Sequence, residues 1–457
     1  RQRQMCIRDR LWKLGILSKT QHNEVAPAQH EMAPIYSTAN IATDHNQLVM
    51  ETMKKVARRH NFECLLHEKP FAGVNGSGKH DNWSLVTNTG KNLLSPGKTP
   101  YDNKQFLLFL SAVIAAVDDN AALLRMSASN PGNDHRLGAN EAPPAIISIF
   151  LGEQLEDIVE QILQNGTATH SNKGERMDIG VHTIPPIKKD ATDRNRTSPF
   201  AFTGNKFEFR MVASSMSIAG ANTVLNATVA DVLQSMADRM EKTDDLDKTV
   251  DEIIYETLKE HQKVIFNGNG YSDEWIAEAE KRGLPNVKTM VDATASLLYP
   301  KTIEMFERQH VYTKTELESR AEINYEAYAK AINIEAKTMI HMASKEYIPA
   351  IISYVTSLGD SINSISAACA EADLSVQKDL LTTCSSLLAK AQTALYALKD
   401  ADKKANAMEE GKEQAEFFRD TVFTAMADLR APIDELEMIV DKEYWPVPSY
   451  GDMLFEV

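Results

Sequence analysis

The sequence predicts an α+β fold in which a sheet-containing part is followed by a long, all-helical region. Period-two alternation at Lys206–Met211, with charged residues on one face and Phe and Met on the other, predicts a strand. A strongly apolar stretch at Gln105–Leu124 predicts a core helix. Heptad-like apolar spacing through Tyr325, Ala329 and Ile332 predicts long antiparallel helices with charged surfaces.

The composition limits the class of protein. At 457 residues, 43% hydrophobic and 25% charged, the chain resembles an ordinary soluble protein of roughly three domains. The net charge of −15 argues against a nucleic-acid binder, because binding to phosphates needs clustered Lys and Arg. The four cysteines show no C-x-x-C spacing, so we expect neither a zinc site nor a disulfide framework, and a reducing, cytoplasmic compartment. The sequence contains no run of eighteen apolar residues, so it predicts no membrane-spanning helix.

The first ten residues, RQRQMCIRDR, differ in character from the rest, with four arginines and one aspartate. We predict that residues 1–10 are non-native sequence, and the fold is predicted without them. The next segment, LWKLGILSKT, reads as the end of a helix, so we expect the natural protein to be longer at its N-terminus.

The segment His22–Tyr36 holds two glutamates, Glu24 and Glu31, on either side of Pro27. In one unbroken strand these side chains would face opposite ways, but Pro27 interrupts the strand and allows them to converge. Two carboxylates near an imidazole suit a hard cation such as Mg²⁺ or Mn²⁺. The alternative is a pair of solvated glutamates on an edge strand.

The stretch KPFAGVNGSGKHDNWS, residues 69–84, allows two interpretations. Its G-V-N-G-S-G-K run fits the core of a P-loop, but His80 stands where the Mg²⁺-binding Ser or Thr is needed, and no amphipathic helix follows. We therefore favour a glycine-rich loop that leads into a strand. In that strand His80 and Ser84 share one face, while Asp81 and Trp83 share the other. The plainer alternative is a turn before a core strand with a satisfied histidine.

The remaining elements are predicted from spacing and turn residues. Helical periodicity predicts helices at Ile41–His60, Asn222–Met240, Asp245–Phe266 and Ser272–Arg282, and ECLL at 63–66 predicts a short strand. Asn, Gly and Pro throughout residues 127–144 predict a loop, which by composition alone is a solvated turn.

Several of these stretches together resemble one family. The pattern K-P, a short apolar run, N-G-S-G-x-H and a Ser four residues later is similar to the ATP-region signature of glutamine synthetases. The same resemblance covers EVAPAQHE, RLGANEAP, NRTS and KFEFR, in family order. The long helical extension and the closing sequence resemble type III glutamine synthetases.

The resemblance implies a curved antiparallel-sheet catalytic domain, incomplete at its N-terminus, followed by helices. We expect a partial catalytic domain at residues 11–240 and a helical region for packing and oligomerisation at residues 241–457. The family's small N-terminal β-domain and first catalytic strands, with two further metal-binding glutamates and an aspartate for ammonium, would lie upstream. We expect a chain without them to lose activity.

The resemblance also implies roles for particular residues. Glu24 and Glu31 would hold one metal ion, and His80 with Glu208 another. The commoner types carry a second arginine five residues after the phosphate-binding one, and this chain has Ala201 there. The other implied roles are catalysis by Glu141 and Arg196, substrate binding by Asn75, Gly76, Arg136 and Arg210, and ATP binding by Ser84, Lys206 and Arg196.

The implied activity is ATP-dependent ligation of ammonia to L-glutamate through γ-glutamyl phosphate, with Mg²⁺ or Mn²⁺, in a ring-shaped homo-oligomer such as a hexamer or dodecamer. Three alternatives stay open from the sequence. A γ-glutamyl-amine ligase would keep the metal and ATP residues but differ in the ammonium pocket. A noncatalytic assembly or regulatory protein could share the fold. A metal-dependent hydrolase would need no nucleotide site.

Overall fold

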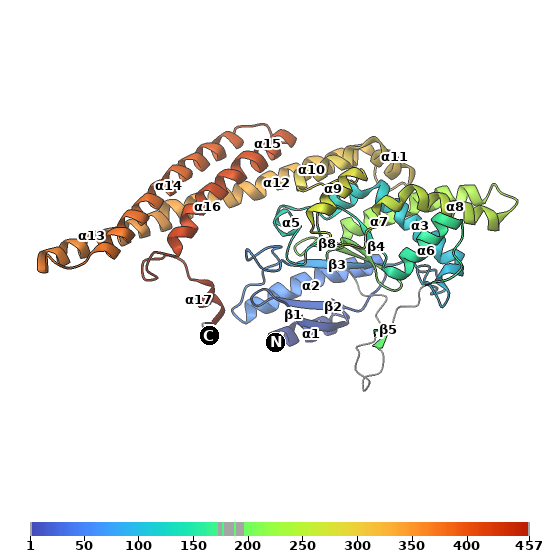
Figure 1. The fold of residues 1–457 in the computed structure, drawn as a ribbon, viewed down its shortest axis with the longest axis horizontal. Coiled ribbons are helices and arrows are strands. Elements are labelled where there is room, and N and C mark those ends of the chain that lie inside the picture. The colour runs from blue at the N-terminus through green and yellow to red at the C-terminus, as the bar shows by residue number, and fades with distance from the viewer. Residues whose placement is uncertain (1, 172–175, 178–186, 189–195, 456–457) are drawn as a thin grey trace. The chain divides into compact units, whose positions relative to one another are not determined.

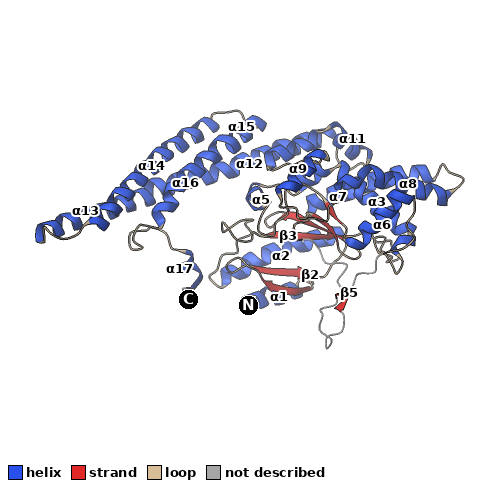
Figure 2. Cartoon of the chain, in the orientation of Figure 1, coloured by secondary structure: helices blue, strands red, loops and turns tan. Residues whose placement is uncertain are grey.

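The computed structural model describes residues 2–171, 176–177, 187–188 and 196–455. The chain forms two compact units, Arg1–Glu318 (unit 1) and Ser319–Val457 (unit 2). All strands of the described residues lie in unit 1, as Figure 2 shows in red, while unit 2 is helical. The predicted α+β fold with a helical C-terminal region is therefore confirmed. The predicted domain boundary at 240/241 falls within unit 1 and stays a prediction.

Unit 1 alternates strands and helices along the chain (Figure 1). Its strands are β1 (Ser18–Asn23), β2 (His30–Pro34), β3 (Gly78–Trp83), β4 (Ile149–Phe150), β5 (Arg176–Met177), β6 (Ile187–Lys188), β7 (Phe200–Phe202) and β8 (Phe207–Ala213). Its helices are α1 (Gln2–Lys13), α2 (Ala39–Arg59), η1 (Pro100–Asp102), α3 (Lys104–Asp119), α4 (Ala121–Ser127), α5 (Pro131–Arg136), α6 (Glu153–Asn165), α7 (Ala219–Met240), α8 (Leu246–His261), η2 (Gln262–Val264), α9 (Asp273–Lys281), α10 (Met290–Thr294), η3 (Ala295–Leu298) and α11 (Pro300–Arg308).

The central sheet has four strands in the order β3-β8-β7-β4. The pairs β3–β8 and β8–β7 are antiparallel, as predicted, whereas β4 runs parallel to β7. Two further strand pairs, β1–β2 and β5–β6, are antiparallel and separate from this sheet. The interior position of β8 matters most for the site, because it places the residues of that strand directly beside those of β3.

Strand β3 alternates as the sequence predicts. Asp81 and Trp83 are buried against α7, where Asn222 Nδ2 donates to Asp81 Oδ2 (3.0 Å) and Trp83 Nε1 donates to Asn226 Oδ1 (2.9 Å). Burial raises the pKa of the Asp81 carboxyl to about 6, and the bond from Asn222 opposes that rise. His80 therefore faces the opposite side of the sheet from α7.

Strand β8 forms as predicted and is buried on both faces, which its period-two alternation alone does not specify. Glu208 and Arg210 are each 3% exposed. On the other face aromatic rings fill the core, with Phe207 stacked on Phe200 of β7 at 4.8 Å between centroids. Such ring pairs contribute about 1 kcal/mol beyond the area they bury. The strand can hold charges inside because its aromatic face fixes it in the core.

Most predicted helices are confirmed. The structure differs from the prediction where one long helix is broken in two and where short elements were expected or missed. The predicted helix at 105–124 is two helices, α3 and α4, which meet at Asn120 with a bend of 81°. The predicted loop at 127–144 contains the short helix α5, which begins with Pro131 and is capped by the side chain of Asn130. The predicted strand at 63–66 is not formed.

Among the described residues, no single helix combines the length and the apolar composition needed to cross a membrane. Only α3 and α4 taken together, despite their bend, would meet that requirement, and most of α3 is buried in unit 1.

Unit 2 is built from long helices joined by short turns (Figure 1). Apolar residues at helical spacing, including Leu387, Ala391, Leu395 and Leu398, are buried along one side of its longest helix. The side chains of the predicted heptad-like pattern, Tyr325, Ala329 and Ile332, are likewise buried. The helices are α12 (Lys314–Met342, which begins in unit 1), η4 (Ala343–Tyr347), α13 (Ile348–Ala368), α14 (Ser375–Ala405), α15 (Lys412–Phe417), η5 (Phe418–Val422), α16 (Phe423–Glu437) and α17 (Tyr450–Phe455).

A buried ion pair joins the ends of α3 and α8 in unit 1. His261 Nδ1 lies 2.8 Å from Asp118 Oδ2, and the Lys263 ammonium lies 3.3 Å from the same oxygen. Burial lowers the pKa of His261, but the hydrogen bond to Asp118 and the charge of Asp119 outweigh it and leave the pKa above 6.5. Folding therefore favours the protonated imidazole.

The stability that this pair contributes is present below pH 6.5 and is lost as the pH rises through the raised pKa of His261. We expect His261→Gln to lower the free energy of unfolding by roughly 1–2 kcal/mol at pH 6 and by less at pH 9. Urea unfolding at the two pH values measures the difference. His60→Gln, at the exposed end of α2, is the control and should show no such pH dependence. An equal effect of His261→Gln at both pH values would contradict the assignment.

Candidate active site

The hairpin β1–β2 brings Glu24 and Glu31 together, as the sequence predicts. Pro27 lies in the turn, and the register places His22 of β1 opposite Glu31 of β2. The two carboxyl groups share a hydrogen bond, which is the main cause of the raised pKa of Glu24, with burial and the charge of Glu31 adding to it. Two carboxylates this close repel each other when both are ionised, so the pair has a high affinity for a proton or a cation.

The second predicted metal pair also forms. His80 Nδ1 lies 2.9 Å from Glu208 Oε1, across the neighbouring strands β3 and β8. Glu208 is 3% exposed, while the His80 side chain is 28% exposed and lines a cavity. The buried carboxylate orients the imidazole toward that cavity, in the way carboxylates commonly orient metal-binding histidines.

The glycines of N-G-S-G make room for Arg136. A Cβ added at Gly78 would overlap the guanidinium of Arg136, and one added at Gly76 would lie 3.0 Å from its Cγ. The guanidinium is held by Asn133 Oδ1 (3.1 Å) and by the carbonyl oxygen of Arg210 (3.1 Å). The glycines are therefore needed for close packing against a buried cation rather than for a phosphate-binding turn.

Two guanidinium groups give this part of the site a positive charge. Arg136 and Arg210 are 4% and 3% exposed, and both line the cavity. Burial, together with the charge of Arg210, lowers the pKa of Arg136 to about 10, so it stays protonated at neutral pH. A carboxylate or phosphate group is the natural partner for such a pair, because each guanidinium offers several directed donors.

The predicted flap residue, Glu141, bridges two other predicted residues. Its Oε1 accepts from Arg196 Nη1 (2.6 Å) and its Oε2 accepts from Asn75 Nδ2 (3.1 Å). Its backbone carbonyl accepts from Arg210 Nη2 (3.2 Å). Glu141 thus connects the glycine-rich loop, the segment before β7 and strand β8, although its side chain is 43% exposed.

These residues surround one cavity of about 410 Å³ in unit 1. Every predicted site residue lines it except Glu208, Ser84 and Lys206, and Glu208 contacts the lining residue His80. Helix α2 contributes Val49, Met50 and Met53 to the cavity wall. The lining residues among the predicted set are Glu24, Glu31, Asn75, Gly76, His80, Arg136, Glu141, Arg196 and Arg210.

Ser84 and Lys206 lie elsewhere. Ser84 Oγ donates to the carbonyl oxygen of Asn205 (3.0 Å), and Lys206 Nζ to that of Thr203 (3.4 Å). Their predicted role in ATP binding stays a prediction. Ala201 is fully buried on β7, opposite Glu208, so the sheet leaves no space there for the arginine of the commoner types.

The structure adds residues that the sequence did not single out. Gln29 lines the cavity, and its Nε2 donates to the carbonyl oxygen of Gly76 (3.1 Å). Lys79 also lines it, with its ammonium donating to the carbonyl oxygen of Met216, and burial lowers its pKa to about 8. Tyr271 reaches the flap from the segment between α8 and α9, where its hydroxyl donates to the carbonyl oxygen of Ala142 (2.8 Å). The only sequence signal for Tyr271 is the turn-rich run N-G-N-G-Y-S.

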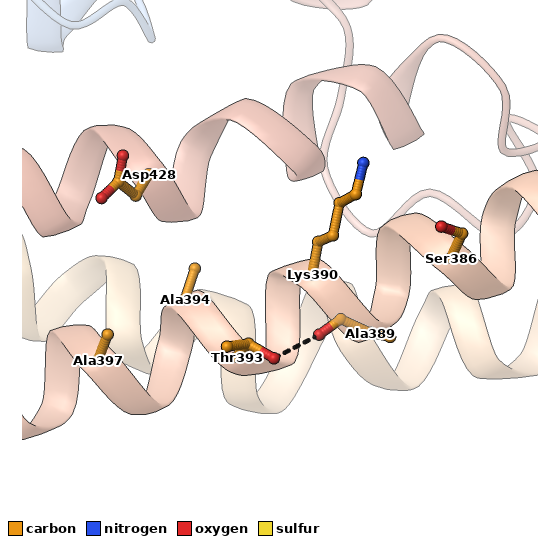
Figure 3. A pocket seen from close by; sticks show the side chains of 7 residues that line it. All are labelled: Ser386, Ala389, Lys390, Thr393, Ala394, Ala397 and Asp428. Atoms are coloured by element: carbon orange, nitrogen blue, oxygen red, sulfur yellow. Dashed lines mark hydrogen bonds between the residues drawn. The ribbon is translucent and has the colours of Figure 1, made fainter.

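Two other features of the described residues fall outside this site. Asp118, Asp119 and His261 place potential ligand atoms within 4.8 Å of one another, but the ammonium of Lys263 already neutralises Asp118. A hollow of about 600 Å³ lies on unit 2, along α14 and α16 (Figure 3). Figure 3 shows mostly small side chains there, with one hydrogen bond from Thr393 Oγ1 to the carbonyl oxygen of Ala389 (3.0 Å).

Comparison with known proteins gives consistent matches. Residues 3–146 match the family model described as glutamine synthetase, catalytic domain, and residues 249–366 match the glutamine synthetase C-terminal domain. A glutamine synthetase of Butyrivibrio fibrisolvens is 46% identical over 98% of this chain and 64% of its own length. A Plasmodium falciparum glutamine synthetase solved by electron cryomicroscopy has a TM-score of 0.46 at 13% identity, over 70% of this chain and 57% of its own length.

The chain belongs to the glutamine synthetase family, whose members typically bind ATP and a divalent metal. Within it, the Type-3 glutamine synthetase of Dictyostelium discoideum is 44% identical over 98% of this chain and 62% of its own length, which confirms the resemblance to type III. The chain spans less than two thirds of the length of these curated relatives.

The packing of Gly78 on Arg136 predicts a specific sensitivity. We expect Gly78→Ala to lower the thermal midpoint by several degrees, because overpacking a buried site costs about 1–3 kcal/mol. Gly220→Ala is the matched control, since its added Cβ would meet only ordinary contacts inside α7 and should be neutral or stabilising. Differential scanning fluorimetry compares the two. An unchanged midpoint for Gly78→Ala would show that Arg136 moves freely.

Proposed function

We propose that this chain carries out the catalytic chemistry of glutamine synthesis, forming L-glutamine from L-glutamate and ammonia at the expense of ATP. The intermediate is γ-glutamyl phosphate. The observation that carries the proposal is the cavity itself, because residues predicted from five separate stretches of sequence line it together. Membership of the family, stated above, agrees with it.

The donor set of the cavity fits a divalent metal. The carboxyl groups of Glu24 and Glu31 lie close enough for a hydrogen bond, which raises the pKa of Glu24, and this convergence of two carboxylates supports a cation site. Oxygen donors of this kind suit Mg²⁺ or Mn²⁺. Glu24 and Glu31 would hold one ion and His80 with Glu208 another, and a bound ion would neutralise phosphate charge during phosphoryl transfer.

The cationic part of the cavity suits the amino acid substrate. Arg136 and Arg210 would bind a carboxylate of glutamate, with Asn75 and Gly76 at the edge of the same site. A γ-carboxylate oxygen of glutamate attacks the γ-phosphorus of ATP, which forms γ-glutamyl phosphate and releases ADP. Arg196, 75% exposed and able to reorient, would stabilise the phosphate oxygens.

The flap residue would serve the second half of the reaction. Ammonia attacks the acyl carbon, the bond from that carbon to the phosphate oxygen breaks, and inorganic phosphate leaves. The Glu141 carboxylate would take the surplus proton from the attacking nitrogen. In its present position it pairs with Arg196 and Asn75, so it must exchange these contacts for the substrate.

We also propose a cytoplasmic enzyme that acts as a homo-oligomer, of the ring type that the resemblance implies. The free cysteines among the described residues and the net charge of −15 agree with a reducing, aqueous compartment.

The direct test incubates the purified chain with Mg²⁺, ATP, glutamate and ammonium and measures both phosphate and glutamine. We expect equal amounts of the two products, dependent on all three substrates, and a loss of at least 100-fold in Glu208→Ala, because that change removes the buried partner of His80. Asp251→Ala, an exposed ion-pair change on α8, is the control. Product formed with ethylamine but not with ammonium would instead identify a γ-glutamyl-amine ligase. Phosphate release without any amide product would favour a hydrolase.

A second test addresses the metal. We expect Glu24→Gln to weaken Mn²⁺ binding by roughly tenfold or more, because it removes a charged ligand. It also removes the repulsion between Glu24 and Glu31 that a bound cation would relieve. Titration calorimetry of the purified chain with Mn²⁺ measures this without turnover. Glu51→Gln, an exposed carboxylate on α2, is the matched control. Equal Mn²⁺ affinity in Glu24→Gln and in the unaltered chain would exclude this pair as the metal site.

A further inference from the structure

A short loop between η2 and α9 makes three sets of contacts around the active site. Asn267 Oδ1 accepts from the backbone amides of Leu151 and Gly152 (2.9 and 3.0 Å). The amide of Gly270 donates to Thr197 Oγ1 (2.8 Å), next to Arg196. The Tyr271 hydroxyl donates to the carbonyl oxygen of Ala142 (2.8 Å), next to Glu141. We call residues 267–271 the clamp loop.

The segment that Tyr271 holds is strained. Asn140 and Glu141 both have left-handed backbones, with φ of 52° and 66°. For residues other than glycine this conformation costs about 1 kcal/mol or more per residue. Such a segment stays in one position only if surrounding contacts fix it. Two side chains from other parts of the chain donate to its backbone. Arg210 donates to the carbonyl oxygen of Glu141, and the Tyr271 hydroxyl donates to that of Ala142.

The surroundings of Tyr271 keep its hydroxyl a donor. Burial raises the pKa of Tyr271 above its ordinary value, with the Glu141 carboxylate adding to the rise and the charge of Arg210 opposing it. The phenol is therefore protonated throughout the neutral range. The clamp loop is also tightly placed, because a Cβ added at Gly270 would lie 3.0 Å from the carbonyl oxygen of Thr197 and 3.3 Å from Pro144 Cγ.

We propose that Tyr271 is a positioning residue that sets the closed position of the Glu141 flap. Through this contact the clamp loop, which lies in the matched C-terminal region, controls the access of water to the acyl phosphate. This inference rests on the proposed function, because it assigns Tyr271 a part in that reaction. Tyr271 acts through the backbone of Ala142 and so through the neighbouring Glu141. The contact joins the two matched regions, 3–146 and 249–366.

The chemical consequence concerns the fate of γ-glutamyl phosphate. With the flap in place, ammonia attacks the acyl carbon and phosphate leaves. With the flap loosened, water attacks the same carbon, the same carbon–oxygen bond breaks, glutamate is regenerated and inorganic phosphate is released. ATP is then consumed without glutamine, so the ratio of phosphate to glutamine rises above one. A residue that served stability alone would lower both products together.

The kinetic test uses Tyr271→Phe, which removes only the hydroxyl. We expect the ratio of phosphate to glutamine to rise at least twofold and KM for ammonium to rise roughly fivefold to tenfold, with KM for ATP unchanged within twofold. Tyr299→Phe, an exposed tyrosine of the same unit, is the matched control and should leave all three values unchanged. Unchanged ratio and KM values in an active Tyr271→Phe enzyme would overturn the proposal.

Hydrogen exchange of the peptide that covers residues 138–144 tests the positioning without any turnover. We expect faster exchange there in Tyr271→Phe than in Tyr299→Phe or the unaltered chain, and the same change in Gly270→Ala, which displaces the clamp loop. If exchange rises but no variant, nor the unaltered chain, forms glutamine, the proposed function fails while the contact is upheld. If exchange in this peptide is the same in all four proteins, Tyr271 does not hold the flap and the inference is wrong.

Discussion

The close packing of a buried guanidinium against two glycines is the contact on which the rest of the site depends. Arg136 occupies the space that a side chain at Gly78 would take, and it binds the carbonyl oxygen of Arg210 on β8. A side chain at Gly76 would meet the carbonyl oxygen of Glu68 first and the Arg136 side chain next. One residue of α5 thereby fixes the distance between the glycine-rich loop and the central strand. Burying a cation is costly unless it is well hydrogen-bonded, and here Asn133 and backbone carbonyls supply the bonds. The remaining positive charge faces the cavity, where an anionic substrate can use it.

How much of this could be predicted from the sequence depends on the range of the interactions involved. The convergence of Glu24 and Glu31 has a local cause, the turn between two short strands, and the residues alone allowed it. The pairing of His80 with Glu208 joins two strands that are far apart in the sequence, and it was expected only from the family resemblance. The complete burial of Glu208 and Arg210 was not expected, because it depends on how the rest of unit 1 covers the sheet, which no local pattern specifies.

Other differences from the sequence predictions have other causes. The predicted loop around Asn130 contains a helix because its side chain caps the amide of Asn133, a short-range contact that composition alone conceals. Ser84 lies next to Asn92 and Asn205, since two loops distant in sequence meet there. Tyr271 was missed for a different reason. Tyr271 follows a run of turn residues in the region 241–457, which was predicted to be helical and to serve packing and oligomerisation. No residue near it in the sequence therefore indicated a contact with the flap.

The flap contacts suggest how strain and charge are balanced in this site. Left-handed backbones at Asn140 and Glu141 would relax if the segment were free. The two backbone hydrogen bonds, from Arg210 and Tyr271, each contribute about 1 kcal/mol or somewhat more, which is of the same order as the strain. The turn also closes on itself, with the Gly138 amide donating to the carbonyl oxygen of Pro143 and the Ala142 amide to that of Ala139. Glu141 can therefore exchange Arg196 and Asn75 for a substrate while its backbone stays held, and the Tyr271 hydroxyl contributes to that hold from a loop remote from the chemistry.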